Sequence, residues 1–493
     1  GVLWEGGVMR TVVFVGGDIG RSPRMQFHAL SLAQCAGHAV DLVGLKGPAP
    51  YPPVLADPNI RLVHLWGLQR FFKSLPRFLF LLAAPFRLLW QFLATLWVLL
   101  FTVKAPNFVI MQNPPALPYM LAVYLACRLR GATFVVDWHN FTYSILELRF
   151  GTNSVITKLA RWFEVSLGRR ADESLCVSKA MRAHMVKMWD IHPTVLYDCP
   201  PAFVGAISLE EKHDLMLRYG LRSPILAEAH AMNEKGGVDG EADAAGELPE
   251  ATLLTEINRK SHQVVARKKR PFVMVTSTSY TPDEDLRILL RALNTLDRDL
   301  QDRVDVGLES PDGVQYVVII TGRGPMKEYY RNTIMRMHLR FCAVRMLWLD
   351  AGDYFKLLSC ADVGISLHFS SSALDLPMKV VDMFGAGTPV LALKYQCIDE
   401  LVHHGSNGMV FKNSVELVEQ IRLLSHDPDL LDQLREGAIR TGGRKFFDEW
   451  TQKTTLLFPV VAPRPPQQQQ PHRREEEEQE QHNQEDAHSV REE

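Results

Sequence analysis

The sequence lacks the patterns that usually indicate a metal site or a disulfide framework. Its 493 residues include seven cysteines, but none stands in a C-x-x-C pair and none has a histidine partner at zinc spacing. We therefore predict no structural zinc and no disulfide network, and we assign no metal ligands. Unpaired cysteines with apolar neighbours favour a reducing compartment. The first residue is Gly1 rather than methionine, so a signal or anchor segment ahead of it stays open.

Three motifs of common α/β enzymes are also missing. The sequence contains no G-x-x-x-x-G-K-[ST], which argues against phosphoryl transfer on a P-loop, and no G-x-S-x-G, which argues against a serine-hydrolase elbow. The glycines at 16, 17 and 20 do not fit G-x-G-x-x-G. Val43 and Gly44 stand where a nicotinamide-binding domain needs an acidic residue. A nicotinamide-binding function is therefore disfavoured.

Acidic residues are absent between Asp57 and Asp137, while basic residues are scattered through that part. The whole chain has a formal net charge of −2, which gives no reason to predict a nucleic-acid partner. Residues 75–103 are the most apolar part, and their uncharged portion, 88–103, would be about 24 Å long as a helix, short of a ~30 Å hydrocarbon core. We expect a membrane-interacting helix that lies in the membrane face, and aromatic residues such as Trp97 support it. A buried core helix is the alternative.

Strand-like and helix-like segments alternate through two halves of the chain. This order predicts two doubly wound, Rossmann-like α/β domains that face each other across a cleft. Between the halves the periodicity is lost, and residues 234–249 have the composition of a disordered insertion. The expected boundaries are a first domain at 10–202, which contains the 75–103 segment, a linker at 203–270, a second domain at 271–443, a closing helix at 444–461 and a disordered Gln/Glu-rich tail at 462–493.

The stretch 363–390 carries the clearest binding signal. A buried strand is expected at 363–369, three serines and Asp375 follow, and Pro377 suits the first turn of a helix. A polar turn between a strand end and a helix start is where parallel sheets bind anions. Lys379 and Asp382 share a helix face, so they could contact a phosphate and sugar hydroxyls. The alternative is a capped helix with one surface ion pair.

Two further polar segments follow predicted strands in the first half. After a strand at 10–15, Gly16 and Gly17 precede Arg21, which favours a phosphate- or sugar-binding loop; the alternative is only a tight turn. A strand at 132–136 ends in Asp137 and His139, which are placed for ligand contact unless His139 is only a structural hydrogen-bonding residue. A nucleotide-sugar transferase needs a diphosphate clamp, acceptors for sugar hydroxyls and a base, and the chain has candidates for each.

Four segments carry a resemblance to a known family. They are residues 17–26 (GDIGRSPRMQ), 137–140 (DWHN), 277–285 (STSYTPDED) and 374–385 (LDLPMKVVDMFG). In these segments the chain closely resembles the eukaryotic chitobiosyldiphosphodolichol β-mannosyltransferase family, from about residue 10 to 461 apart from the insertion. The resemblance implies a GT-B fold, with GDP-mannose as donor and dolichyl-diphosphate-linked chitobiose as acceptor. It also implies an endoplasmic reticulum membrane location with the catalytic domains on the cytosolic face, and other mannosyltransferases of the pathway as candidate partners.

The donor site departs from the wider GT-B pattern. Retaining GT-B transferases carry an E-x7-E signature. Here the two acidic residues are Asp375 and Asp382, which stand one residue closer together. The usual Arg and Lys phosphate pair is also missing after residue 275, so Arg323 and Lys379 are left as the expected diphosphate clamp. The other expected donor contacts are Gly16, Gly17, Arg21, Ser277, Ser279, Asp375 and Asp382, the last of them at the donor ribose.

The family implies a β-linked product from an α-linked donor, and therefore inversion in one displacement with a general base. We expect Asp18 to be the base, with Glu147 in reserve, and His139 to face the mannose. No cofactor is required by the sequence, and Mg²⁺ on the diphosphate stays open. Two alternatives remain: another GT-B transferase that acts on a lipid-linked acceptor, and an inactive membrane scaffold of a glycosylation complex.

Overall fold

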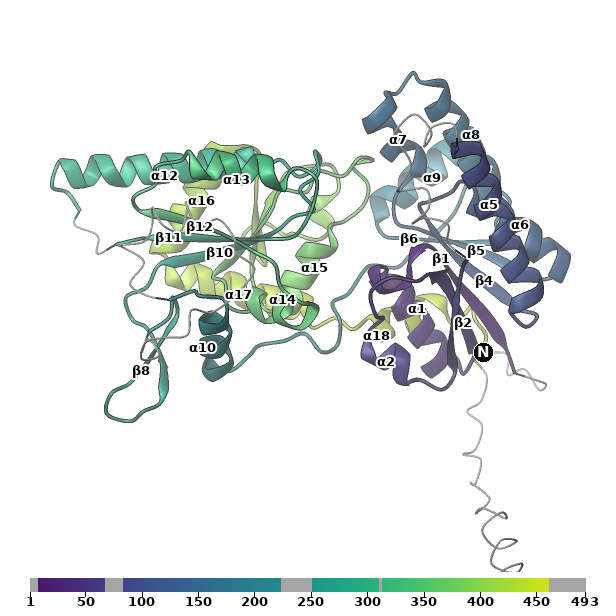
Figure 1. Cartoon of the computed structure of the whole chain (residues 1–493), viewed down its shortest axis with the longest axis horizontal. Coiled ribbons are helices and arrows are strands. Elements are labelled where there is room, and N and C mark those ends of the chain that lie inside the picture. The colour runs from purple at the N-terminus through teal and green to yellow at the C-terminus, as the bar shows by residue number, and fades with distance from the viewer. Residues whose placement is uncertain (1–7, 67–82, 223–250, 310–312, 461–493) are drawn as a thin grey trace, which may run out of the picture.

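The computed structural model describes residues 8–66, 83–222, 251–309 and 313–460, which form two α/β domains (Figure 1). The first domain has a seven-stranded sheet in the order β3-β2-β1-β4-β5-β6-β7. All neighbouring strands in this sheet are parallel. Its strands are β1 (Arg10–Asp18), β2 (Ala39–Leu45), β3 (Ile60–His64), β4 (Phe108–Asn113), β5 (Thr133–Trp138), β6 (Glu173–Cys176) and β7 (Thr194–Val195).

Helices cover both faces of the first sheet (Figure 1). They are α1 (Pro23–Gln34), α2 (Pro52–Ala56), α5 (Ala84–Trp97), α6 (Tyr119–Arg130), α7 (Thr142–Phe150), α8 (Val155–Gly168) and α9 (Lys179–Trp189), with short turns of helix at η1 (Ile19–Arg21) and η2 (Val98–Thr102). The core lies on both sides of the sheet, because Val12 and Phe14 of β1 pack into one cluster while Val13 and Val15 pack into another. A strand that is buried on both faces reads as a continuous apolar run, as strands of parallel sheets do.

The second domain repeats this plan with six parallel strands in the order β12-β11-β10-β13-β14-β15. Its strands are β10 (Phe272–Ser277), β11 (Tyr316–Thr321), β12 (Cys342–Leu347), β13 (Val363–Ser366), β14 (Val390–Leu393) and β15 (Gly408–Phe411). Its helices are α12 (Arg287–Asp305), α13 (Lys327–Met335), α14 (Ala351–Leu358), α15 (Met378–Gly385), η3 (Ile398–Glu400), α16 (Ser414–His426) and α17 (Pro428–Gly442).

In both sheets the strand order reverses once, between β1 and β4 and between β10 and β13. Ligands of doubly wound sheets bind outside the carboxyl ends of the strands at such a reversal. The prediction of two doubly wound α/β domains is therefore confirmed, and the two reversal points are where a site is expected. A final helix, α18 (Phe446–Thr454), returns to the first domain, where the Phe446 and Phe27 rings lie 5.4 Å apart between centroids.

Local boundaries differ from the sequence prediction in three places. β1 runs on to Asp18, so Gly16 and Gly17 lie in the strand rather than in a turn, whereas β13 stops at Ser366. Part of the range predicted as a linker is ordered. It contains α10 (Leu209–Arg218), which starts with a capping box between Ser208 and Glu211, and the antiparallel strands β8 (Thr255–Ile257) and β9 (Val264–Ala266). The insertion predicted at 234–249 and the tail at 462–493 lie outside the described residues.

The apolar segment predicted to meet the membrane forms a long helix. Ala84–Thr102 is long and apolar enough to cross a membrane by length and composition, with a mean hydropathy of 1.5 and only 17% of that apolar window buried. A core helix would be mostly buried, so the core-helix alternative does not fit. Four of the exposed side chains, Phe86, Leu89, Leu93 and Trp97, form an apolar stripe along α5. Residues 75–82 of the predicted segment lie outside the described part of the chain.

Candidate active site at the facing strand ends

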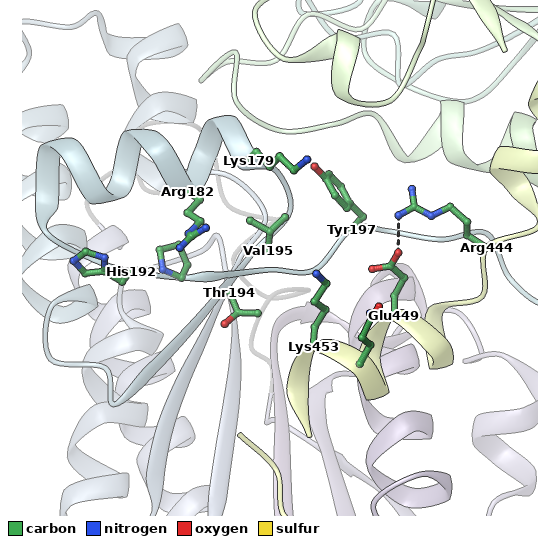
Figure 2. A pocket seen from close by; sticks show the side chains of 11 residues that line it. Lys179, Arg182, His192, Thr194, Val195, Tyr197, Arg444, Glu449 and Lys453 are labelled. Carbon is green, nitrogen blue, oxygen red and sulfur yellow. Dashed lines mark hydrogen bonds and ion pairs between the residues drawn. The ribbon is translucent and has the colours of Figure 1, made fainter. Parts of the chain in front are cut away.

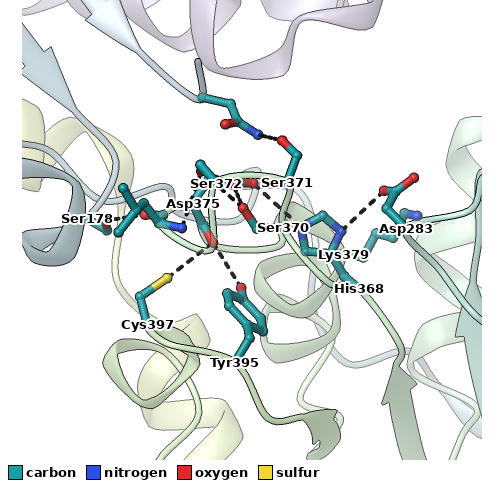
Figure 3. Close-up of polar contacts among 12 residues, drawn as sticks. Ser178, Asp283, His368, Ser370, Ser371, Ser372, Asp375, Lys379, Tyr395 and Cys397 are labelled. Atoms are coloured by element: carbon teal, nitrogen blue, oxygen red, sulfur yellow. Dashed lines mark hydrogen bonds and ion pairs between the residues drawn. The ribbon is translucent and has the colours of Figure 1, made fainter. Parts of the chain in front are cut away.

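The carboxyl ends of the two sheets meet through the loop that follows β13, which we call the serine loop (residues 370–376). The Asn140 amide, beyond the end of β5, donates to Ser371 Oγ at 3.2 Å, and Ser144 Oγ of α7 lies 3.1 Å from the same atom. Ser178 Oγ donates to the Leu374 carbonyl oxygen. Figure 3 shows Ser178 and Ser371 on opposite sides of the loop. The reversal point of the second sheet therefore borders the strand ends of the first.

Asp137, at the end of β5, is the centre of a buried charged network. Arg24 of α1 donates from Nε and from one terminal nitrogen to the two Asp137 oxygens at 2.7 and 2.9 Å. The other terminal nitrogen donates to Asp198 at 2.9 Å. Burial opposes ionisation of Asp137, but Arg24, with His139 and His28, holds the pKa of Asp137 well below its usual range.

Two histidines complete this network, and their hydrogen-bond partners indicate the tautomer of each neutral ring. The Trp450 indole N–H donates to His28 Nδ1 at 3.0 Å, so the proton of the neutral His28 ring is on Nε2, 3.1 Å from Asp137. Burial lowers the pKa of His28, which keeps this ring neutral. His139 Nε2 donates to Asp137 at 2.8 Å, and its side chain is 21% exposed. In the neutral His139 ring Nδ1 is then the acceptor nitrogen.

Glu164 of α8 fixes the start of α7 beside these groups. One oxygen of this buried carboxylate accepts from the Asn113 amide at 2.6 Å and from the Thr142 backbone N–H at 2.8 Å, and the other accepts from the Tyr143 N–H at 3.1 Å. These donors are the free N–H groups of a helix N-terminus, which favour a negative charge. Burial nevertheless raises the pKa of Glu164, and the hydrogen bonds oppose that rise.

The glycines after the apolar part of β1 have different surroundings. A Cβ on Gly16 would lie 2.7 Å from Pro115 Cγ, and one on Gly20 would lie 2.1 Å from the Pro48 carbonyl oxygen. A Cβ on Gly17 would meet nothing within 4 Å. Close packing therefore requires glycine at positions 16 and 20, whereas the backbone of Gly17 faces open space. Asp18 follows it and pairs with Arg21 at 3.4 Å.

We expect Gly17→Val to leave the fold intact and to weaken ligand binding about tenfold or more, because the new side chain would enter the space in front of the strand end. The thermal midpoint measures the first effect, and the Michaelis constants for the donor and acceptor that the sequence resemblance implies measure the second. Gly16→Val is the matched control, since its side chain meets Pro115 and should cost about 1–3 kcal/mol of stability. Equal destabilisation by both variants would contradict the assignment of Gly17 to the site.

The serine loop is strained and internally bonded (Figure 3). Among the described residues, four non-glycine residues have a positive φ, and two of them are Ala373 in this loop and Tyr280 after β10. Strained backbone of this kind is concentrated at functional sites. Asp375 accepts a hydrogen bond from Ser370, lies 3.5 Å from His368 Nε2, and through its carbonyl oxygen accepts from the Tyr395 hydroxyl at 2.9 Å.

Lys379, in the first turn of α15, has a partner that the sequence pattern did not indicate. Its ammonium group pairs with Glu284, a buried carboxylate that also accepts from the Ser279 N–H and the Thr278 hydroxyl. Ser279 Oγ lies 3.5 Å from the same ammonium group. An anion at the α15 N-terminus would therefore share Lys379 with Glu284.

Arg323 has different neighbours from Lys379. The backbone around it packs closely on the loop after β10, because a Cβ on Gly322 or Gly324 would lie 1.8 Å from the Thr278 oxygen or 1.6 Å from the Ser279 oxygen. The Arg323 guanidinium lies 3.8 Å from the centre of the ring of Trp348, the residue that directly follows β12. This cation–π contact holds the guanidinium at the β11–β12 side of the site.

Asp382, one turn after Lys379 on α15, has a raised pKa. Its carboxylate accepts from the Tyr354 hydroxyl at 3.3 Å, and Ser277 Oγ donates to that hydroxyl at 3.2 Å. Burial raises the pKa of Asp382 to about 7; Asp198 adds to this rise, and Tyr354 and Lys379 oppose it. A perturbed carboxyl beside a sheet reversal is typical of a functional site.

Asp382→Asn should stabilise the protein more at high pH than at low pH. The raised pKa means that the folded chain keeps a proton on Asp382 that the unfolded chain releases above about pH 4, so wild-type stability falls as the pH rises from there to about 7. Asparagine removes this cost. Thermal unfolding at pH 5 and pH 8 should show a larger gain in midpoint at pH 8; a gain independent of pH would contradict the raised pKa.

Two further features of the described residues concern possible ligand sites. Within the described residues, no group of three or more His, Cys, Asp and Glu side chains is placed to hold a metal ion. A cavity of about 560 Å³ beside β7 is lined by cations that include Lys179, Arg182 and Lys453 (Figure 2). Arg444 in this cavity pairs with Glu449 at 2.5 Å. None of the site residues predicted from the sequence lines it.

Both halves of the chain match known families of proteins. Residues 25–196 match the model of the glycosyl transferase 4-like domain, and residues 257–441 match that of glycosyl transferases group 1. The chain is 41% identical to the UDP-glycosyltransferase TURAN of Arabidopsis thaliana, over 90% of this chain and 95% of that protein. It is 37% identical to the chitobiosyldiphosphodolichol beta-mannosyltransferase of Mus musculus over 94% of this chain and 93% of that protein, and equally identical to that of Homo sapiens over 90% of each.

The chain belongs to the chitobiosyldiphosphodolichol β-mannosyltransferase family. Solved structures agree on the fold of this mannosyltransferase family member. The Anabaena HepE structure with UDP and glucose has a TM-score of 0.57 at 14% identity and covers 92% of this chain and 99% of that one. The lipopolysaccharide glycosyltransferase WaaG has a TM-score of 0.52 at 12% identity, over 92% and 100%. The GT-B fold and the glycosyltransferase class are therefore confirmed.

The structure brings together part of the predicted site of this family member. Ser279 and Lys379 contact each other, and Ser277 reaches Asp382 through Tyr354. Arg323 lies with Trp348 instead, Arg21 pairs with Asp18, and Glu147 lies on α7 in the turn before the helix end. The roles expected for these residues and for Gly16, Gly17, His139 and Asp375 stay predictions.

Several residues of the site were not found from the sequence, chiefly Arg24, His28, Glu164 and Glu284. Each is a charged or titratable residue within a predicted helix or loop, and only tertiary contact shows its partner. Asp137 did carry a signal, since an acid directly after a run of three apolar residues is expected to be buried at a strand end. A buried acid requires a cation, and Arg24 supplies it.

Proposed function

We propose that the chain transfers mannose from GDP-mannose to dolichyl-diphosphate-linked chitobiose and forms the first β-1,4-linked mannose of the lipid-linked oligosaccharide for N-glycosylation. The observation that carries the proposal is identity of 37% to mannosyltransferases of this name over nearly the whole length of both chains. The polar site residues described above support an enzyme rather than an inactive scaffold. The relative at 41% identity is named for UDP, so the donor nucleotide is the part that most needs a direct test.

The second domain is the proposed donor side. The diphosphate would lie at the N-terminus of α15, where free N–H groups and the helix dipole attract anions. Lys379 would exchange its contact with Glu284 for a phosphate oxygen, with Arg323 as the second cation. Asp382, whose carboxyl is held by Tyr354, would accept from the ribose hydroxyls. Because burial raises the pKa of Asp382 to about 7, its neutral acid and its carboxylate would both be populated near neutral pH.

The first domain is the proposed acceptor side. A base takes the proton of the attacking chitobiose hydroxyl as its oxygen bonds to the mannose anomeric carbon and the bond from that carbon to the diphosphate breaks. GDP leaves with the electron pair, and the configuration inverts from α to β. Asp18 is our proposed base, and Glu147 stays in reserve. His139 would face the mannose, and its bond to Asp137 supports this by fixing the ring.

We further propose that the chain works at the cytosolic face of the endoplasmic reticulum membrane. The acceptor in this proposal has a dolichyl tail, so the catalytic domains need to reach a lipid surface. The exposed apolar stripe of α5 supports such contact. Other mannosyltransferases of the pathway are candidate partners, and Mg²⁺ on the donor diphosphate is an open point of the proposal.

A transfer assay tests the proposed function. Purified protein is incubated with labelled GDP-mannose and a short-chain chitobiosyl diphosphate lipid, and the product is treated with β-mannosidase or α-mannosidase. The expected result is one added mannose that only β-mannosidase releases. Addition of Mg²⁺ or EDTA in parallel shows whether the metal is required. Absence of transfer, or an α-linked product, would overturn the proposal.

A further inference from the structure

The helical hairpin formed by α7 and α8 carries an exposed apolar surface that the reaction does not explain. Seven large apolar side chains within eighteen residues are between 44% and 80% exposed: Ile145, Leu148, Phe150, Val155, Ile156, Leu159 and Trp162. Scattered single residues of this kind are normal on a protein surface, but a contiguous group indicates a binding surface. We call these seven residues the hairpin face.

The spacing of the hairpin face shows that it is continuous on each helix. On α8, Val155, Leu159 and Trp162 follow one another at intervals of four and three, and on α7 Ile145 and Leu148 are three apart, so each set shares one side of its helix. The two helices pack against each other in Figure 1, at the edge of the first domain that also holds α5 and α6. Both α5 and α8 contact α6, and residues of α6, of α8 and of the turn η2 that continues α5 pack in one core cluster, so the hairpin and α5 lie on the same face of the first sheet.

Three of the five charged residues on the hairpin (residues 142–168) are basic: Arg149, Lys158 and Arg161. Lys158, three residues after Val155, is exposed, as is Arg149 on α7, whose guanidinium lies 5.4 Å from the Phe150 ring. Of the two acidic residues, Glu164 is buried in the contacts with α7 and Glu147 is partly exposed. Aromatic and aliphatic side chains flanked by Lys and Arg are the composition of elements that bind an anionic lipid surface.

The hairpin is fixed to the candidate active site rather than loosely attached. The buried Glu164 carboxylate joins α8 to the first turn of α7 and to Asn113 at the end of β4. Two residues before α7 lies Asn140, which contacts the serine loop of the second domain. A lipid surface that touches the hairpin face would therefore lie beside the meeting point of the two sheets.

We propose that the hairpin face docks on a bilayer that contains anionic headgroups, as a second contact in addition to α5. Its aliphatic and aromatic side chains enter the interface, and Arg149 and Lys158 meet the headgroup charge. The purpose of this docking rests on the proposed function, because a lipid-linked acceptor in the docked bilayer would present its diphosphate next to the site. The docking itself is independent of which sugar is transferred.

Vesicle co-sedimentation tests this proposal with the full chain and vesicles of phosphatidylcholine, with or without phosphatidylserine. The double variant Leu159→Glu/Trp162→Glu should bind the phosphatidylserine vesicles about tenfold more weakly. The matched control is Val415→Glu/Leu423→Glu, which removes two exposed apolar residues of α16 in the second domain and should bind as the wild type does. Lys158→Glu should weaken binding to the anionic vesicles and not to the neutral ones. Thermal midpoints of all variants should stay close to that of the wild type.

Two results would overturn the docking proposal. One is unchanged vesicle binding by the Leu159→Glu/Trp162→Glu variant. The other is a wild-type dimer in sedimentation that this variant converts to a monomer, because the hairpin face would then be covered by a second copy. A mannosyl-transfer assay with a water-soluble chitobiosyl diphosphate separates this proposal from the function. Lost vesicle binding with normal soluble transfer supports docking, whereas hairpin-dependent docking without any transfer rejects only the proposed function.

Discussion

Replacing Asp137 with alanine is expected to lower the free energy of unfolding by about 3–5 kcal/mol, because Arg24 would remain buried without its main partner. Both side chains are almost inaccessible to solvent, at 3% and 0% exposure. Urea unfolding of the wild type and the variant near pH 7 measures the difference. The variant should also lose activity, since His139 and His28 lose the carboxylate that orients them.

The surface pair Arg61–Asp41 is the control for this prediction. Its charged groups also lie 2.6 Å apart, but Arg61 is 53% exposed, so Asp41→Ala should cost no more than about 1 kcal/mol. The pH dependence provides a second check. The pKa of Asp137 is held low in the folded state, so its contribution is present above its ordinary pKa and is lost as the pH falls toward the folded value. Equal costs for the two variants would contradict the buried network.

The second large effect is expected on kcat, when the proposed general base Asp18 is replaced. Asp18→Asn should lower kcat by about 10²- to 10⁴-fold with little change in donor affinity, since the amide cannot accept the proton of the acceptor hydroxyl. Single-turnover rates and GDP binding by calorimetry measure the two quantities separately. The partner of Asp18, Arg21, is 73% exposed, so the stability of this variant should stay near that of the wild type.

The structure supplies sharp comparisons for the base. His139→Gln removes the ring that Asp137 orients, and Glu147→Gln changes the reserve carboxylate. If Asp18 is the base, only the Asp18→Asn variant loses the rise of kcat with pH. The His139→Gln variant keeps that rise but changes the Michaelis constant for the donor. Retained turnover in Asp18→Asn together with a dead His139→Gln variant would move the base to His139.

Much of the fold was predictable because its elements carry local signals. The strands at 10–15, 272–275 and 316–321 are apolar runs followed by glycine or polar residues, and alternation with helices fixes the doubly wound order. The extension of β1 to Asp18 was missed because glycines normally weaken a strand. Helix α10 was missed although Ser208 and Glu211 form a recognisable capping box, because it lies within the range 203–270 that was predicted as a linker.

The site was less predictable because its decisive contacts join distant parts of the chain. Arg24 and Asp137 are 113 positions apart, and Glu284 and Lys379 are 95 apart. A pattern within one segment shows that Lys379 can bind an anion, but not that a buried carboxylate already holds it. Likewise the sequence of α5 indicated a lipid contact, whereas the hairpin face became visible only through the exposure of its side chains.

The most direct measurement compares kcat/KM for GDP-mannose and UDP-glucose with the same chitobiosyl diphosphate acceptor and the same enzyme preparation. We expect GDP-mannose to be preferred by about 10²-fold or more and the product to be β-linked. A preference for UDP-glucose would contradict this expectation, even if transfer to the lipid acceptor still occurs.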